Sequence, residues 1–134
     1  MNNVFVSFHM NQPAGRVWDL IGDPARIAEW HPALARSPRE GDLRTCVLPD
    51  GVAIRERIEE EDAAARRYRY TMVESPFPVA NYVATLQVKE DGPARCVVEW
   101  YSTFDAPAPA TAQMVETVRG LYETGLGAVR QRLG

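Results

Sequence analysis

The sequence predicts an α+β domain over residues 1–134, in which a curved antiparallel sheet of about seven strands wraps around a long C-terminal helix. Three observations lead to this prediction. Residues 34–105 alternate apolar and polar side chains in segments separated by turn sequences, which is typical of consecutive antiparallel strands. Residues 107–134 repeat apolar side chains at helical spacing instead. Two short helical segments separate the first strand from the others.

Composition supports one globular domain and excludes several classes of protein. The chain has 134 residues, of which 46% are hydrophobic and 25% are charged, an ordinary balance for a folded domain. Its net charge of −3 has the wrong sign for a general nucleic-acid binder. No segment approaches the roughly 18 apolar residues that span a membrane, and the start has no signal-peptide pattern. We therefore expect a cytoplasmic protein with neither nucleic acid nor membrane as a partner.

The first strand and the helix after it are recognised by their different periods. Residues 3–11 alternate, and one face carries Val4, Val6, Phe8 and Met10. Residues 12–23 then place apolar side chains three and four positions apart, which predicts a short helix. Gly22 follows the last of these side chains, as expected where a helix ends.

A second short helix is predicted over residues 24–30. Asp23 is its expected N-cap, and Pro24 suits the first helical position. Pro32 ends the helix, because a residue that precedes proline avoids helical backbone angles. The helix pair has the outline of a DNA-binding motif, but its second helix carries only Arg26 as a basic residue, which makes it a poor recognition helix.

Six further strands are expected along the middle of the chain. Pro38 limits the first of them to a sheet edge, and the turn at 49–51 joins the second and third as a hairpin. The bend at 76–78 is either a gate over the interior or a stiff corner. The expected strands cover residues 33–40, 43–48, 52–61, 65–75, 79–90 and 94–106.

The C-terminal segment is predicted to be one long amphipathic helix. Gly120, Gly125 and Gly127 lie within it, and each costs about 1 kcal/mol of helix stability relative to alanine. The helix must therefore gain tertiary contacts. Gly125 falls on the apolar face, where the missing side chain either brings the backbone close to the sheet or leaves space.

Alternation also assigns one face of each strand to the interior. The expected inward side chains are Ile54, Glu56 and Ile58, then Tyr68, Tyr70 and Met72, then Tyr82, Ala84, Leu86 and Val88, and finally Cys96, Val98, Trp100, Ser102 and Phe104. Cys46 and Cys96 have no metal-ligand spacing, so no metal site is expected.

The segments "VWDLIGDPARIAEWHP", "GVAIRERIEEED" and "CVVEWYSTFD", in this order of elements, resemble the START-like superfamily. These proteins are also called helix-grip or SRPBCC proteins, and the resemblance is to their polyketide cyclase/dehydrase branch. It covers nearly the whole chain. It implies the helix-grip fold, with a deep cavity between sheet and helix for an apolar or amphipathic small molecule, and it implies no metal or organic cofactor.

The expected partner is a hydrophobic or aromatic small molecule, and a homodimer is compatible with the sequence. Tyrosine and tryptophan suit such a cavity because they combine apolar rings with polar tips. The residues predicted to bind the molecule are Trp30, Ile54, Tyr68, Met72, Phe77, Tyr82, Trp100, Ser102, Val118 and Tyr122.

Three residues are predicted to be catalytic, and each has a structural alternative. An inward Glu56 needs a partner or a raised pKa, so it is a candidate general acid or base. Alternatively, it pairs with Arg44 across the hairpin, or it faces solvent. Tyr70, like Tyr82, either stabilises a developing enolate or belongs to the core. His31 either moves protons at the cavity entrance or only interacts favourably with a helix C-terminus.

Two functions follow from these expectations. One is a cofactor-independent enzyme that closes a poly-carbonyl chain by aldol cyclisation and dehydration, mainly by holding it in a reactive shape. The other is a carrier or sensor of an apolar metabolite. Analogy of fold favours the enzyme. A protein-partner module would require an exposed apolar patch.

Overall fold

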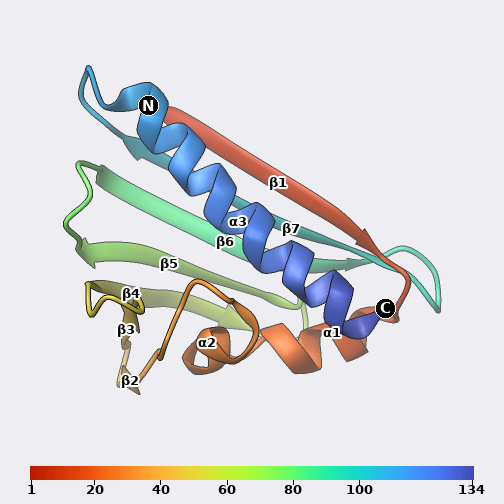
Figure 1. The fold of residues 1–134 in the computed structure, drawn as a ribbon. Helices are drawn as coiled ribbons and strands as arrows, with labels where there is room; N and C mark the ends of the chain where they lie inside the picture. Colours follow the sequence, from red (N-terminus) through yellow and green to blue (C-terminus); the bar gives the residue numbers. More distant parts are fainter.

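The computed structural model describes residues 1–134, which form one seven-stranded antiparallel sheet with a long helix across its concave face (Figure 1). This arrangement confirms the predicted α+β class and the helix-grip fold. The elements are β1 (Asn2–Met10), α1 (Ala14–Ile21), a 3-10 turn (Pro24–Arg26), α2 (Ile27–Trp30), β2 (Arg39–Glu40), β3 (Leu43–Val47), β4 (Ala53–Asp62), β5 (Arg67–Glu74), β6 (Ala80–Glu90), β7 (Cys96–Asp105) and α3 (Thr111–Leu133).

The strands from β2 to β7 pair with their neighbours in chain order, and β1 pairs with β7 as an edge strand of the sheet. The spatial order is therefore β1-β7-β6-β5-β4-β3-β2. The edge strand expected over 33–40 is shorter than predicted. Only Arg39 and Glu40 form a strand, and an isolated bridge joins Arg36 to Val47. Pro38 lies between these pairings and lacks the backbone N–H that a continuous ladder requires.

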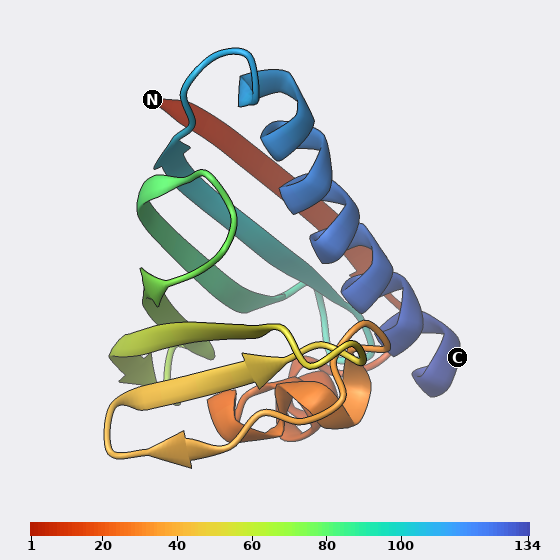
Figure 2. The ribbon, with the colours of Figure 1, turned by 60° about the vertical axis from the view of Figure 1, so that its left-hand side comes forward.

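Irregular pairing bends the sheet toward α3. The register between β4 and β5 shifts at Arg55/Glu56 and again at Ile58/Glu60, and β6 and β7 shift between Ala80 and Val83. Such bulges increase strand twist and bend the ladder. In Figure 2 the strands β3 and β4 consequently face the helix from across the interior rather than lying flat beside β1 and β7.

The predicted inward faces are the buried ones. Along β7 buried and half-buried residues alternate without exception from Cys96 to Asp105. The same phase holds on β6, where Tyr82, Ala84, Leu86 and Val88 are all buried. Large apolar side chains can reach the core from only one face of a strand, so they fix the phase of the whole sheet.

The two short helices begin and end close to the predicted residues. The carboxylate of Asp23 accepts a hydrogen bond from the Ala25 backbone N–H at 3.0 Å, which confirms the N-cap. Gly22 does cap α1, but its φ of −77° lies in the ordinary helical region. Glycine is required there for space, because a Cβ would lie 2.4 Å from the Trp18 ring.

The long helix is held at its C-terminal end by contacts from both sides. The Gln12 amide donates to the Leu133 carbonyl at 2.8 Å, and Arg132 donates to the Glu29 carbonyl at 3.1 Å. The Arg130 guanidinium stands 4.5 Å above the Phe8 ring of β1. The helix runs from Thr111 to Leu133 and is the long C-terminal helix that the sequence predicts. No helix combines the length and apolar character needed to cross a membrane.

Candidate functional site

A pocket of about 240 Å³ lies among the inward faces of strands β3 to β7, α2 and its following loop, and the N-terminal half of α3. Sixteen of its 20 lining residues are hydrophobic. Ten of the thirteen residues that the sequence nominates for catalysis or binding line it. They are His31, Ile54, Glu56, Tyr70, Met72, Phe77, Tyr82, Trp100, Val118 and Tyr122.

Three nominated residues are buried but do not line the pocket. Tyr68 packs beside the Arg44 guanidinium, whose carbon lies 5.6 Å from the tyrosine ring centroid. Trp30 packs 5.7 Å from Trp100, and its indole nitrogen has no hydrogen-bond partner. The Ser102 hydroxyl is likewise buried and without a partner. Alternation predicts that a side chain faces inward, but it does not predict whether that side chain lines the pocket or is buried behind the residues that do.

The charged part of the pocket is an ion pair between Arg44 of β3 and Glu56 of β4. The two residues are direct cross-strand partners, so their side chains emerge side by side on the inner face. Arg44 donates from Nε and Nη2 to the same oxygen of Glu56, at 3.0 and 2.8 Å. Both side chains are buried. The predicted alternative, in which Glu56 pairs with Arg44 across the hairpin, is therefore confirmed.

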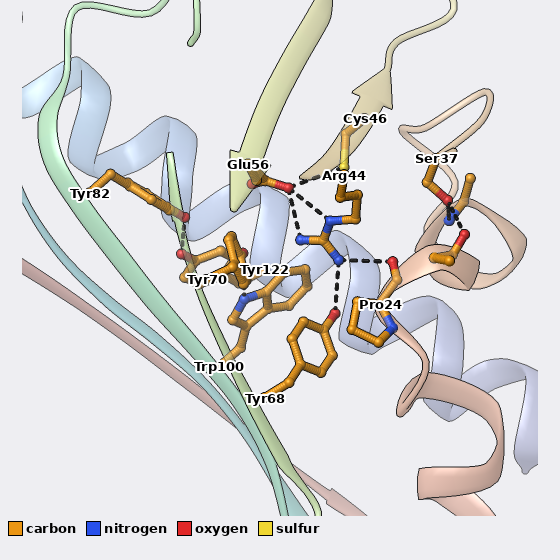
Figure 3. A network of polar contacts seen from close by, with 12 residues as sticks. Pro24, Ser37, Arg44, Cys46, Glu56, Tyr68, Tyr70, Tyr82, Trp100 and Tyr122 are labelled. Carbon is orange, nitrogen blue, oxygen red and sulfur yellow. Dashed lines mark hydrogen bonds and ion pairs between the residues drawn. The ribbon is translucent and has the colours of Figure 1, made fainter. Parts of the chain in front are cut away.

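The remaining hydrogen bonds of Arg44 anchor it to the protein (Figure 3). Its Nη1 donates to the Pro24 carbonyl at 3.0 Å and to the Tyr68 hydroxyl at 3.2 Å. Burial acts most strongly and would lower the pKa of Arg44, but the Glu56 carboxylate together with Tyr68, Cys46 and Tyr70 outweighs it, so the pKa lies well above its ordinary value. Arg44 is thus a fixed cation, and four of its five N–H groups donate within the protein.

The two oxygens of Glu56 have different surroundings. Oε1 accepts both bonds from Arg44 and a third from the Cys46 thiol at 3.3 Å, whereas Oε2 accepts none. Because Glu56 lines the pocket, Oε2 is an acceptor that remains open to it. Burial and the neighbouring Glu56 charge raise the pKa of Cys46, so its thiol stays neutral and is a poor nucleophile.

Four aromatic side chains form the polar and stacked part of the wall. The Trp100 indole N–H donates to the Tyr70 hydroxyl at 3.1 Å, and the hydroxyls of Tyr82 and Tyr122 are hydrogen-bonded to each other. The rings of Trp100 and Tyr122 stack with centroids 4.3 Å apart. Burial raises the pKa of all three tyrosines, to about 12 for Tyr82. They are neutral hydrogen-bonding groups near neutral pH.

His31 is held by both of its ring nitrogens. Its Nδ1 accepts from the Ala33 backbone N–H at 3.2 Å, so Nε2 carries the proton and donates to the Leu121 carbonyl at 2.8 Å. The backbone of His31 is extended, with φ −94° and ψ 113°, as the following Pro32 predicts. His31 therefore ties the loop after α2 to the middle of α3. Its predicted catalytic role stays a prediction.

Acid should destabilise the fold through His31. Burial lowers its pKa in the folded protein, whereas in the unfolded chain it titrates near about 6.5. As the pH falls below about 6.5, the unfolded chain binds a proton that the folded protein does not, and the free energy of unfolding decreases. The decrease ends once the pH is below the folded pKa.

Urea unfolding between about pH 5 and 8 measures this effect. A His31→Gln variant should lose the pH dependence that lies between about 6.5 and the folded pKa. His9 is exposed on β1, so His9→Gln should keep it. An unchanged slope in the His31 variant would show that another group is responsible.

The sequence did not nominate ten of the lining residues. Cys46 lies two positions from Arg44, so both side chains are on the inner face of β3. The sequence could have predicted this, because Arg44 and Cys46 pair with Glu56 and Ile54, which were expected to face inward. Met114 and Leu121 belong to the apolar stripe of the long helix. Loop residues such as Ala33 and Leu34 carry no periodic signal. The ten are Ile27, Ala33, Leu34, Arg44, Cys46, Leu48, Val79, Met114, Thr117 and Leu121.

No group of three or more histidine, cysteine, aspartate or glutamate side chains is arranged to hold a metal ion. The polar groups of the pocket wall that can act in chemistry include Glu56 Oε2 and the tyrosine hydroxyls, and Thr117 also lines the pocket. This set can accept one hydrogen bond at a carboxylate and donate others from neutral phenols.

Comparison with known proteins shows the family to which the sequence is similar. The whole chain, residues 1–134, matches the family described as "Polyketide cyclase / dehydrase and lipid transport". An uncharacterised protein from Bacillus thuringiensis is 33% identical, with a TM-score of 0.93 and 98% of each chain covered. The protein XoxI from Bacillus cereus is 32% identical, with a TM-score of 0.94, and the alignment covers 98% of this chain and 95% of XoxI.

A more distant similarity is to BexL, a di-domain ARO/CYC protein of a biosynthetic pathway. It is 20% identical with a TM-score of 0.85, and the alignment covers 99% of this chain and 46% of BexL. At this identity the similarity shows the fold alone. No curated protein matches the sequence.

Proposed function

Because this chain belongs to the polyketide cyclase/dehydrase and lipid transport family, we propose that its pocket binds one small hydrophobic or aromatic molecule that carries a polar group. The observation that carries this proposal is the composition of the pocket wall. Sixteen of 20 lining residues are hydrophobic, and the few polar atoms belong mainly to Glu56 and the tyrosines. Ligand sites typically combine an apolar lining with a few placed polar groups that orient the ligand.

The size of the pocket limits what can fill it. Sites for drug-sized molecules measure roughly 300–1,000 Å³, and a cavity of about 150 Å³ accommodates benzene. At about 240 Å³ this pocket suits a molecule of one or two rings. A long poly-carbonyl chain would have to extend out of the pocket beyond its rim.

Binding of 2-naphthol to the purified protein tests the proposal, with affinity measured by calorimetry. Thr117 is half-buried on the pocket wall, whereas Glu116 beside it is exposed. Thr117→Trp should fill the pocket and weaken binding by roughly tenfold or more, and Glu116→Trp should leave the affinity unchanged. Absence of binding by the wild-type protein, or equal affinity in the two variants, would contradict the proposal.

A second candidate function is cofactor-independent aldol cyclisation and dehydration, and the open oxygen of Glu56 favours it. Glu56 Oε2 would take a proton from the carbon beside a substrate carbonyl, while Tyr70 donates to that carbonyl oxygen as it becomes an enolate. The enolate carbon then bonds to a second carbonyl carbon, whose oxygen takes up the proton as a hydroxyl. Loss of this hydroxyl with a proton from the adjacent carbon releases water and forms the enone.

His31 would act here as a positioning residue, because both of its ring nitrogens already bind the protein. A diketone able to close a six-membered ring tests the candidate through the absorbance of the enone product. Glu56→Gln should abolish product formation and still bind the diketone. Product formation that persists in this variant would exclude Glu56 as the base, and a wild-type protein without turnover would leave binding as the function.

A further inference from the structure

We infer that the pocket selects neutral molecules that carry a hydroxyl group, such as phenols and enols, and that it rejects carboxylates. This inference rests on the proposed function and names the class of ligand. It rests on two observations: Arg44 donates most of its hydrogen bonds to the protein, and Glu56 Oε2 accepts none from it.

The pocket offers no free positive charge to an anion. Arg44 is the only arginine or lysine among the lining residues. Four of its five N–H groups donate within the protein, two to Glu56, one to the Pro24 carbonyl and one to Tyr68, and only the second N–H of Nη2 has no partner. The Tyr70 ring covers one face of the guanidinium, with its centroid 4.7 Å from the guanidinium carbon. A ligand carboxylate would therefore meet a cation whose charge is already compensated by Glu56 and which has a single N–H left to donate.

The pocket does offer an unpaired acceptor. Glu56 is only 6% exposed, and Oε2 has no partner, while Oε1 accepts three hydrogen bonds. Oε2 opens onto the pocket and accepts no hydrogen bond from the protein, so only a molecule in the pocket can donate to it. A ligand hydroxyl supplies that bond, whereas a ligand carboxylate adds a second negative charge beside the first.

Tyr70 supplies the complementary donor. Its oxygen accepts from the Trp100 indole at 3.1 Å, so its own proton can turn toward the neighbouring Tyr82 hydroxyl or toward a ligand oxygen. In Figure 3 Glu56 and Arg44 lie side by side, with Tyr70 and Tyr122 below them in the view. A phenol satisfies both groups, because its hydroxyl donates to Glu56 Oε2 and its oxygen accepts from Tyr70. An isosteric methyl group satisfies neither.

Three naphthalenes of nearly equal size test the inference by calorimetry on the full chain. They are 2-naphthol, 2-methylnaphthalene and 2-naphthoate. The hydroxyl bonded to a charged acceptor should make 2-naphthol bind roughly tenfold or more tightly than 2-methylnaphthalene. The anion 2-naphthoate should bind at least as weakly as 2-methylnaphthalene.

The double variant Arg44→Met/Glu56→Leu is the matched control. Replacing both members of a buried ion pair by apolar residues is often tolerated, so the pocket should persist without its charges. In this variant 2-naphthol should lose its preference over 2-methylnaphthalene. The wild-type series decides the inference even if the variant does not fold.

Each result has a separate meaning. Equal wild-type affinities for 2-naphthol and 2-methylnaphthalene, or tightest binding of 2-naphthoate, would overturn the hydroxyl preference and leave the proposed binding function intact. Failure of all three molecules to bind would contradict the binding function itself.

Discussion

Replacing Arg44 with methionine should lower the free energy of unfolding by about 3–5 kcal/mol, the largest effect we expect from a single substitution in this chain. The substitution leaves the Glu56 carboxylate in the interior without its cation and without two of the three hydrogen bonds to Oε1. It also removes the donors to the Pro24 carbonyl and the Tyr68 hydroxyl. A buried charge left uncompensated costs more than the pair itself contributes.

Urea unfolding at neutral pH measures the loss. Arg57→Met provides a control on the same hairpin, because Arg57 is exposed and pairs only with Glu59 at 4.0 Å; it should change stability by less than about 1 kcal/mol. Adding Glu56→Leu to the Arg44 variant should recover most of the lost stability, since no unpaired charge then remains. A single variant as stable as the wild type would show that the pair is not buried as described.

Gly125→Ala should destabilise the protein by about 1–3 kcal/mol, although alanine favours helices by about 1 kcal/mol over glycine. A Cβ at this position would lie 2.6 Å from His31 Cδ2 and 3.1 Å from the Trp100 ring. Neither ring can withdraw freely, because His31 is bonded through both nitrogens and Trp100 donates to Tyr70. The clash therefore outweighs the gain in helix propensity.

Gly120→Ala is the matched control within the same helix. Gly120 is exposed, and a Cβ there meets no atom within 4 Å, so alanine should stabilise the protein by about 0.5–1 kcal/mol. Thermal or urea unfolding of the two variants gives the comparison. Stabilisation by both alanines would mean that α3 does not approach His31 as closely as the structure indicates.

The fold was predictable because its signals are local. Alternation, turn sequences and capping residues each report on a few neighbouring positions, and large apolar side chains set the phase of every strand. The same reasoning placed Glu56 inside and named Arg44 as one of its partners. An inward carboxylate has few ways to be compensated, and the facing strand of a hairpin is the nearest source of a cation.

The details of the site depend on tertiary contacts that no local pattern records. His31 and Gly125 are 94 residues apart in the sequence, yet the ring occupies the space that the glycine leaves. The sequence predicts the extended backbone of His31 from Pro32, but not that both ring nitrogens are bonded. Likewise, it nominates Tyr82 and Tyr122 separately and cannot show that their hydroxyls meet.

The volume of the pocket is equally hidden from the sequence, because it depends on how far α3 stands from the strands that face it. Residues at the C-terminal end of the helix fix its position through Gln12 and Glu29, at a distance from the pocket lining. Predicting the size of the cavity would therefore require knowing how all the side chains between these contacts and the pocket pack.

The methyl groups of the four methionines test most directly whether the pocket binds a ligand. Met72 and Met114 line the pocket, whereas Met10 is buried elsewhere and Met1 is exposed. In carbon-13 NMR spectra recorded during a titration with 2-naphthol, the signals of Met72 and Met114 should shift to saturation together, while those of Met1 and Met10 stay in place. Saturating shifts confined to Met1 or Met10, or no shift at any methionine, would contradict the account.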